Sequence, residues 1–176
     1  MKMTISKLDA AKRQLETAVR LYFSEADPVS IHTLIGAAHT LFADISRQEN
    51  APRMLLKDEL LDQIKPEYHA KFRKMVNRAQ NFFKHADQDA RETLDFDPGQ
   101  SELLLIDCCR QYYRLAGEYP VLCQVYQAWF FMNNQDLFSP ALKNQIDRLG
   151  NPIPDMLAIG RKRFFEFALS RMADLG

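Results

Sequence analysis

The sequence predicts an all-α protein, a helical bundle of about five main helices with one or two short ones. Apolar residues recur at intervals of three and four through most of the 176 residues, which is the period of helices that bury one face. Asp27-Pro28 and Ser139-Pro140 each combine a capping residue with a proline, a pair that starts helices. Alternation of apolar and polar residues is limited to the surroundings of Leu94 and Phe96, which is too short for a sheet.

The first two helices are predicted to meet at Asp27-Pro28. The apolar face of the first helix consists of Ile5, Leu8, Leu15, Val19 and Tyr22. This helix must end before Asp27, because proline disfavours helical backbone in the residue that precedes it. Asp27 then caps the second helix, and an apolar stripe from Ile31 to Ile45 predicts that this helix packs along its length.

A polar loop, residues 48–66, separates the second helix from the third, and its middle, residues 54–64, is predicted as a short amphipathic helix. The third helix is predicted over residues 67–86. Its buried face is expected to contain Tyr68, Phe72, Met75, Ala79, Phe82 and Ala86. An acidic connector, residues 89–100, follows and ends in the turn signal Asp97-Pro98-Gly99.

The fourth helix, residues 101–116, is apolar on most sides and is therefore predicted to be central, with Gly117 closing it. Pro120 opens a fifth helix, and a shorter helix is predicted over residues 139–150. A stiff linker, Asn-Pro-Ile-Pro at residues 151–154, divides the chain into a bundle domain, residues 1–150, and a C-terminal part, residues 151–176. The last helix, residues 155–174, is expected to pack on the bundle or on a partner subunit.

Composition and charge favour a cytoplasmic protein. The 23 basic and 23 acidic residues give a formal net charge of zero, which argues against a globally basic nucleic-acid binder. No signal peptide is expected, and no membrane association, because no apolar run approaches the ~20 residues that span a bilayer. The three cysteines lack a Cys-x-x-Cys spacing, so neither a disulfide framework nor a zinc knuckle is predicted. No cofactor is predicted, because Gly-rich nucleotide-binding loops are absent.

A polar stripe beside the apolar face of the third helix is a candidate binding surface. Its members share one helix face because they follow one another at intervals of three, four, three and four: Lys71, Lys74, Arg78, Asn81 and His85. Lys84 adds a further cation, and residues 65–84 carry only one acidic residue. Such a face is suited to RNA or another phosphate-bearing ligand. A solvated helix face with cations near its C-terminal end explains the same pattern.

His32 and His39 lie seven residues apart, which places them two turns apart on one face of the second helix. Gly36 and Ala43 share that face and would let a neighbouring backbone come close. Each histidine is expected to be half-buried with one hydrogen-bond partner at a helix crossing. A small-ligand or metal site built from His32, His39 and His85 is the alternative. No metal is assigned, because bundles usually bind metals through paired carboxylates or Glu-x-x-His, and neither pattern occurs.

Residues 78–85, Arg-Ala-Gln-Asn-Phe-Phe-Lys-His, resemble the arginine-to-histidine motif of HEPN-domain proteins. Those are small all-helical proteins, and many are metal-independent ribonucleases. The resemblance implies that His85 acts as general acid or base on a ribose 2′-hydroxyl, that Arg78 holds the scissile phosphate, and that Asn81 orients the reacting groups. Ala79 departs from the motif, since the family usually has a polar residue directly after the arginine.

Three further segments resemble a family of small bacterial all-helical proteins of unassigned function. They are residues 7–16 (KLDAAKRQLE), residues 27–34 (DPVSIHTL) and residues 81–89 (NFFKHADQD). The likeness covers roughly the first 97 residues. It implies a bacterial cytosolic protein and transfers no activity.

The sequence thus leaves three functions open, and with them whether the protein is an enzyme. The first is binding or oligomerisation, since Phe130, Phe131 and Met132 in succession cannot all face one core and a homo-oligomer is expected. The second is a ribonuclease that uses Arg78 and His85. The third is binding of a small ligand or metal around the histidines. The candidate ligand-binding residues are His32, His39, Lys71, Lys74 and Lys84.

Overall fold

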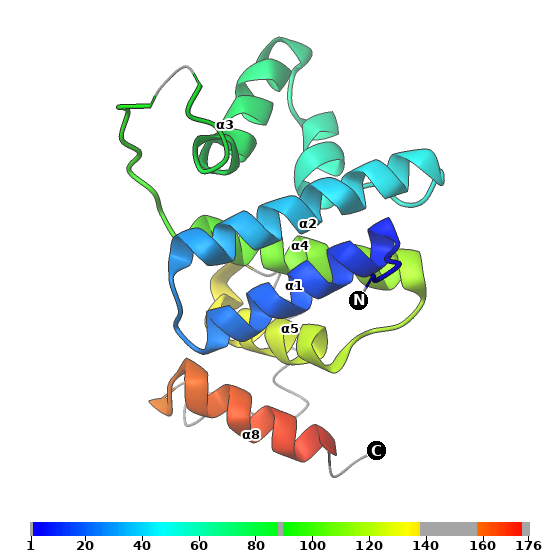
Figure 1. The fold of residues 1–176 in the computed structure, drawn as a ribbon, viewed down its shortest axis with the longest axis vertical. Coiled ribbons are helices and arrows are strands. Elements are labelled where there is room, and N and C mark those ends of the chain that lie inside the picture. Colours follow the sequence, from blue (N-terminus) through cyan, green and yellow to red (C-terminus); the bar gives the residue numbers. More distant parts are fainter. Residues whose placement is uncertain (1, 88–89, 138–157, 174–176) are drawn as a thin grey trace.

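The computed structural model describes residues 2–87, 90–137 and 158–173. In this part of the chain the regular elements are all helical, which confirms the predicted all-α class. The body consists of α1 (Lys7–Phe23), α2 (Pro28–Gln48), α4 (Gly99–Ala116) and α5 (Val121–Asn133). Helices α3 (His69–Phe82) and α8 (Arg161–Ala173) lie at opposite ends of the long axis of the molecule (Figure 1).

Three helix ends in the body of the bundle have well-defined caps, and those at Asp27 and Gly117 confirm the predicted boundaries. Ser6 caps α1, since its hydroxyl accepts a hydrogen bond from the backbone N–H of Asp9 at 3.0 Å. Asp27 caps α2 by accepting from the backbone N–H of Ser30 at 2.7 Å. Gly117 adopts a φ of 70° and closes α4, a backbone conformation that suits glycine.

The core lies between the four helices of the body. Its fully buried members include Leu15, Val19, Phe23, Ile35, Phe42, Leu105, Cys108, Cys109, Cys123 and Tyr126. All three cysteines are buried and free, and burial raises the pKa of Cys108 and Cys109 well above the usual value, which makes them inert apolar side chains. Phe164 of α8 packs on this core, with its ring 6.2 Å from Phe23 and 5.0 Å from Trp129.

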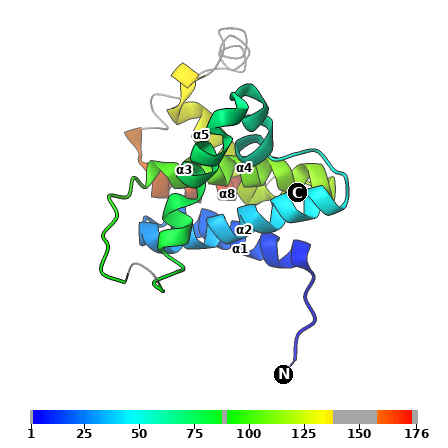
Figure 2. The ribbon, with the colours of Figure 1, turned by 90° about the horizontal axis from the view of Figure 1, so that it is seen from above.

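Between α2 and α4 the chain makes three short helical turns and then α3. The predicted helix over residues 54–64 is replaced by a π-helical turn, η1 (Leu55–Glu59), and a 3₁₀ turn, η2 (Leu61–Gln63). A further 3₁₀ turn, η3 (Pro66–Tyr68), precedes α3. The segment that leads into α4, residues 90–98, runs outside the body of the bundle, as both ribbon views show (Figure 2).

The predictions for two helices need correction. The third helix covers residues 69–82 rather than 67–86, because η3 precedes it and the chain turns at Phe83, whose ring packs against His32. The last predicted helix is not continuous, because Gly160 adopts a φ of 81° that interrupts helical backbone, and α8 begins at Arg161; the predicted start at residue 155 lies outside the described residues. The predicted helix over residues 139–150 and the linker over residues 151–154 lie outside the described residues.

Two predictions about buried faces also need correction. Tyr68 and Met75 are 53% and 61% exposed, since α3 meets the bundle mainly through Ala79 and Gln80 near its C-terminal end. Phe130 is buried, and both Phe131 and Met132 pack partly buried against the same core. That run therefore gives no support to the expected homo-oligomer, which stays a prediction.

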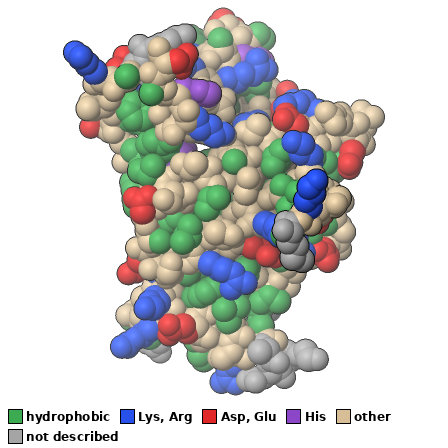
Figure 3. Space-filling model, viewed as in Figure 1, with side chains coloured by type: hydrophobic (Ala, Val, Ile, Leu, Met, Phe, Trp, Pro, Cys, Tyr) green, Lys and Arg blue, Asp and Glu red, His purple; other side chains and the backbone are tan. Residues whose placement is uncertain are grey.

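Surface charges match the neutral composition. In the view of Figure 3, acidic and basic side chains are interspersed with hydrophobic ones and are not gathered by sign. Within the described residues, no helix is both long and apolar enough to cross a membrane.

Candidate functional site

The two histidines of α2 lie on the face that meets α4, and both are 1% exposed. Nδ1 of His32 lies 3.0 Å from Oγ of Ser101, and Nε2 of His39 donates to Oδ2 of Asp107 at 2.8 Å. The prediction of one hydrogen-bond partner at a helix crossing is confirmed for both. Both histidines are buried more deeply than the half-buried state that the sequence predicts, because segments other than α4 also cover them.

Asp107 is a buried acid that the sequence patterns did not predict as part of a site. Besides His39, its carboxylate accepts hydrogen bonds from the backbone N–H groups of Leu55 and Leu56, each at 3.1 Å. These bonds tie the start of η1 to α4. A single acid within an otherwise apolar turn, Ile106-Asp107-Cys108, was the signal available in the sequence, since buried acids are almost always paired.

Helix α3 is held over α2 at Gly36. Nε2 of Gln80 donates to the carbonyl oxygen of Gly36 at 2.8 Å. A Cβ atom at position 36 would lie only 3.0 Å from Cδ of Gln80, so the glycine is what admits this side chain. The close approach predicted at Gly36 is therefore present, but a side chain of α3 makes it rather than another backbone.

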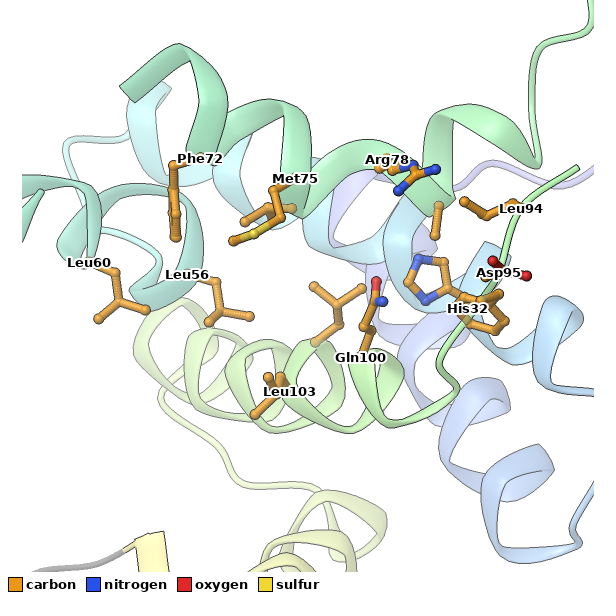
Figure 4. A pocket seen from close by; sticks show the side chains of 14 residues that line it. His32, Leu56, Leu60, Phe72, Met75, Arg78, Leu94, Asp95, Gln100 and Leu103 are labelled. Carbon is orange, nitrogen blue, oxygen red and sulfur yellow. The ribbon is translucent and has the colours of Figure 1, made fainter. Parts of the chain in front are cut away.

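A pocket of about 440 Å³ opens between α3, η1, the segment around residues 94–96 and α4. One end of it is apolar and is lined by Leu56, Leu60, Phe72, Met75, Val76, Leu103 and Leu104. The other end carries the polar groups His32, Arg78, Asp95 and Gln100 (Figure 4). The pocket therefore has one apolar and one polar end.

His32 contributes a polar atom without a partner to this pocket. Its Nδ1 is taken by Ser101, and Nε2 is buried with no hydrogen-bond partner among the described residues. The rings of Phe83 and Phe96 stand edge-on to the imidazole at centroid distances of 5.7 and 5.0 Å. Burial lowers the pKa of His32 to about 4, so the ring is neutral at pH 7. A neutral imidazole can present Nε2 as either a donor or an acceptor.

A second hollow, a groove of about 960 Å³, runs along α3 and holds the predicted polar stripe. Its lining includes Lys71, Lys74, Arg78, Asn81 and His85, together with the acidic residues Asp87 and Glu92. Lys84 is exposed and lies outside this lining. Arg78 and Met75 line both the groove and the pocket, so the two hollows adjoin.

The structure separates the three histidines that the sequence analysis considered together. His32 lines the pocket, His85 lines the groove, and His39 lines neither of them. Among the described residues, no group of three His, Cys, Asp or Glu side chains is placed to hold a metal ion. Of these three histidines, His32 is the one that lines the pocket.

Comparisons with models of protein families, with curated proteins and with solved structures find no match to this chain. The two resemblances noted in the sequence therefore stay predictions. The geometry of the pocket and the groove is what indicates the chemistry of this protein.

Proposed function

We propose that this protein binds a small, largely apolar molecule in the pocket at His32. The observation that carries the proposal is Nε2 of His32, a buried polar atom without a partner among the described residues, at the polar end of a cavity whose other end is apolar. Small-molecule sites typically have volumes of about 300–1,000 Å³ and apolar walls with a few polar groups that orient the ligand. The pocket of about 440 Å³ fits that description.

Both parts of the pocket favour such a ligand energetically. Leaving a buried polar group without a hydrogen bond costs about 1–3 kcal/mol, and a ligand hydroxyl, carbonyl or amine at Nε2 of His32 would remove this cost. The apolar end adds a gain of roughly 25 cal/mol for each Å² of apolar surface that the ligand and the protein bury together. The expected ligand therefore binds through one hydrogen bond to His32 and through burial of its apolar part.

Binding of a neutral fluorescent probe tests this proposal. N-phenyl-1-naphthylamine is expected to gain fluorescence with the wild-type protein, because its rings enter the apolar end and its N–H reaches His32. Ala79 is 3% exposed and lines the pocket, so Ala79→Leu fills part of the cavity. We expect its affinity for the probe to fall at least about tenfold.

The matched control is Ala128→Leu, the same substitution at an exposed position of α5 outside the pocket. It is expected to bind the probe as the wild type does. The proposal is wrong if the wild type leaves the probe dark, or if folded Ala79→Leu binds it unchanged.

A second candidate function is metal-independent cleavage of RNA, favoured by the groove in which Arg78, Asn81 and His85 lie together. A histidine placed there can transfer a proton while an arginine holds a phosphate. We expect single-stranded RNA to be cleaved in EDTA, and His85→Ala to slow cleavage at least about 100-fold. Arg20→Ala, an exposed cation of α1, serves as the control. RNA that stays intact with folded wild-type protein would exclude this function.

A further inference from the structure

We infer that the ligand of the pocket at His32 is an α-amino acid with a bulky apolar side chain, whose zwitterionic head group lies between Arg78 and Asp95. The inference rests on the proposed ligand-binding function and names its ligand class. Its basis is the distribution of charge and apolar surface along the pocket. Opposite charges stand at one end, and apolar side chains fill the other.

Arg78 and Asp95 come from two different segments and reach the same end of the pocket. Arg78 projects from α3, and Asp95 belongs to the irregular segment before α4 (Figure 4). Neither takes part in any of the ion pairs among the described residues, so their charged groups are more than 4.0 Å apart. Each has the capacity to meet a ligand group of opposite charge.

A head group with a single charge does not satisfy this end of the pocket. A carboxylate would pair with Arg78 but would be repelled by Asp95. An ammonium group would pair with Asp95 but would be repelled by Arg78. A zwitterion pairs with both at once, and the guanidinium of Arg78 suits a carboxylate because it can donate two parallel hydrogen bonds. Nε2 of His32 and the side-chain amide of Gln100 lie at the same end and can form hydrogen bonds with the other polar atoms of the head group.

The apolar end determines the side chain of the amino acid. Leu56 of η1, Leu60 directly after η1, and Phe72 of α3 face the cavity, as Figure 4 shows. Short or polar side chains would leave this apolar surface without contacts. A large aliphatic or aromatic side chain removes the apolar wall of the pocket from water, which favours binding in proportion to the area buried.

Calorimetric titration with four compounds of matched apolar body tests the inference. They are L-phenylalanine, 3-phenylpropanoate, phenethylamine and 3-phenylpropan-1-ol, which carry a zwitterionic, an anionic, a cationic and a neutral head. We expect L-phenylalanine to bind at least about tenfold more tightly than each of the other three. A singly charged or neutral compound that binds as tightly overturns the inference.

Two variants assign the charges to their residues. Arg78→Gln is expected to weaken L-phenylalanine about tenfold and to leave phenethylamine no weaker than in the wild type. Asp95→Asn is expected to weaken L-phenylalanine similarly and to leave 3-phenylpropanoate no weaker. Arg20→Gln and Asp136→Asn, exposed residues outside the pocket, are the matched controls and should bind as the wild type does. Unchanged affinity for L-phenylalanine in both pocket variants also overturns the inference.

The outcomes separate this inference from the proposed function. If the neutral naphthylamine probe and the phenyl alcohol bind but the zwitterion has no advantage, the pocket binds small molecules and the assignment of the head group is wrong. If none of the four compounds and no probe binds, both the inference and the proposed function fail.

Discussion

Asp107→Ala is expected to lower the free energy of unfolding by about 3–5 kcal/mol, because three hydrogen-bond donors lose their acceptor at a cost of about 1–3 kcal/mol each. The variant leaves three donors without an acceptor: the partly buried backbone N–H groups of Leu55 and Leu56, and the buried Nε2 of His39. Each such loss is costly in the interior because water does not replace the missing acceptor. Urea unfolding followed by circular dichroism measures the change.

The same variant connects stability to the candidate site. The bonds from Asp107 fix the start of η1, and η1 carries Leu56 to the apolar end of the pocket. We therefore expect Asp107→Ala to bind the naphthylamine probe more weakly even at temperatures where it is folded.

Asp107→Asn keeps one acceptor oxygen and is expected to lose less stability. Asp136→Ala removes an exposed acid and should change stability by no more than about 0.5 kcal/mol. A loss below about 1 kcal/mol in Asp107→Ala would refute the structural role given to this carboxylate.

Acidification from pH 7 to pH 5 is expected to destabilise the protein by about 2 kcal/mol through His32 alone. Burial lowers the pKa of this histidine from 6.5 to about 4 in the folded protein. Between these two values the unfolded chain binds a proton that the folded protein does not. Stability is therefore lost as the pH falls through 6.5 towards 4, and the loss levels off below that point. Burial also lowers the pKa of His39, which adds a loss of the same sign.

The variant His32→Gln isolates this contribution. We expect the difference in unfolding free energy between pH 7 and pH 5 to be smaller in His32→Gln than in the wild type by about 2 kcal/mol. Any constant destabilisation by the substitution cancels, because the comparison is made between two pH values of the same variant. An equal pH dependence in both proteins would show that His32 is not buried as a neutral ring.

Local signals in the sequence predicted the body of the bundle correctly. Asp27-Pro28 and Gly117 act locally, through the capping side chain of Asp27 and the backbone conformations of Pro28 and Gly117, so their effect on helix ends is visible without knowledge of the fold. The spacing of His32 and His39 beside Gly36 likewise predicted buried histidines with partners, since small residues on the same face indicate a close helix crossing.

The pocket was not predictable from the same signals. His32 comes from α2, and the other walls come from four segments that are far apart in the sequence: η1 with Leu60, α3, residues 94–96 and α4. Only tertiary packing brings them together. Met75 follows the apolar period of α3 and was predicted to be buried, yet it is 61% exposed because it stands beside a cavity that no protein side chain fills. The unpartnered Nε2 of His32 depends on what all four segments place around it, which no helical period encodes.

The measurement that tests the pocket most directly is the ¹⁵N NMR spectrum of the histidine side chains, recorded at pH 7 with increasing 3-phenylpropan-1-ol. We expect the Nε2 resonance of His32 to shift as the hydroxyl group of the ligand forms a hydrogen bond there. The ring of His39, which donates to Asp107, and that of His85, which lies in the groove, should not respond. A saturable shift at His85 or His39 with unchanged resonances of His32, or no shift at any histidine, would contradict a ligand site at His32.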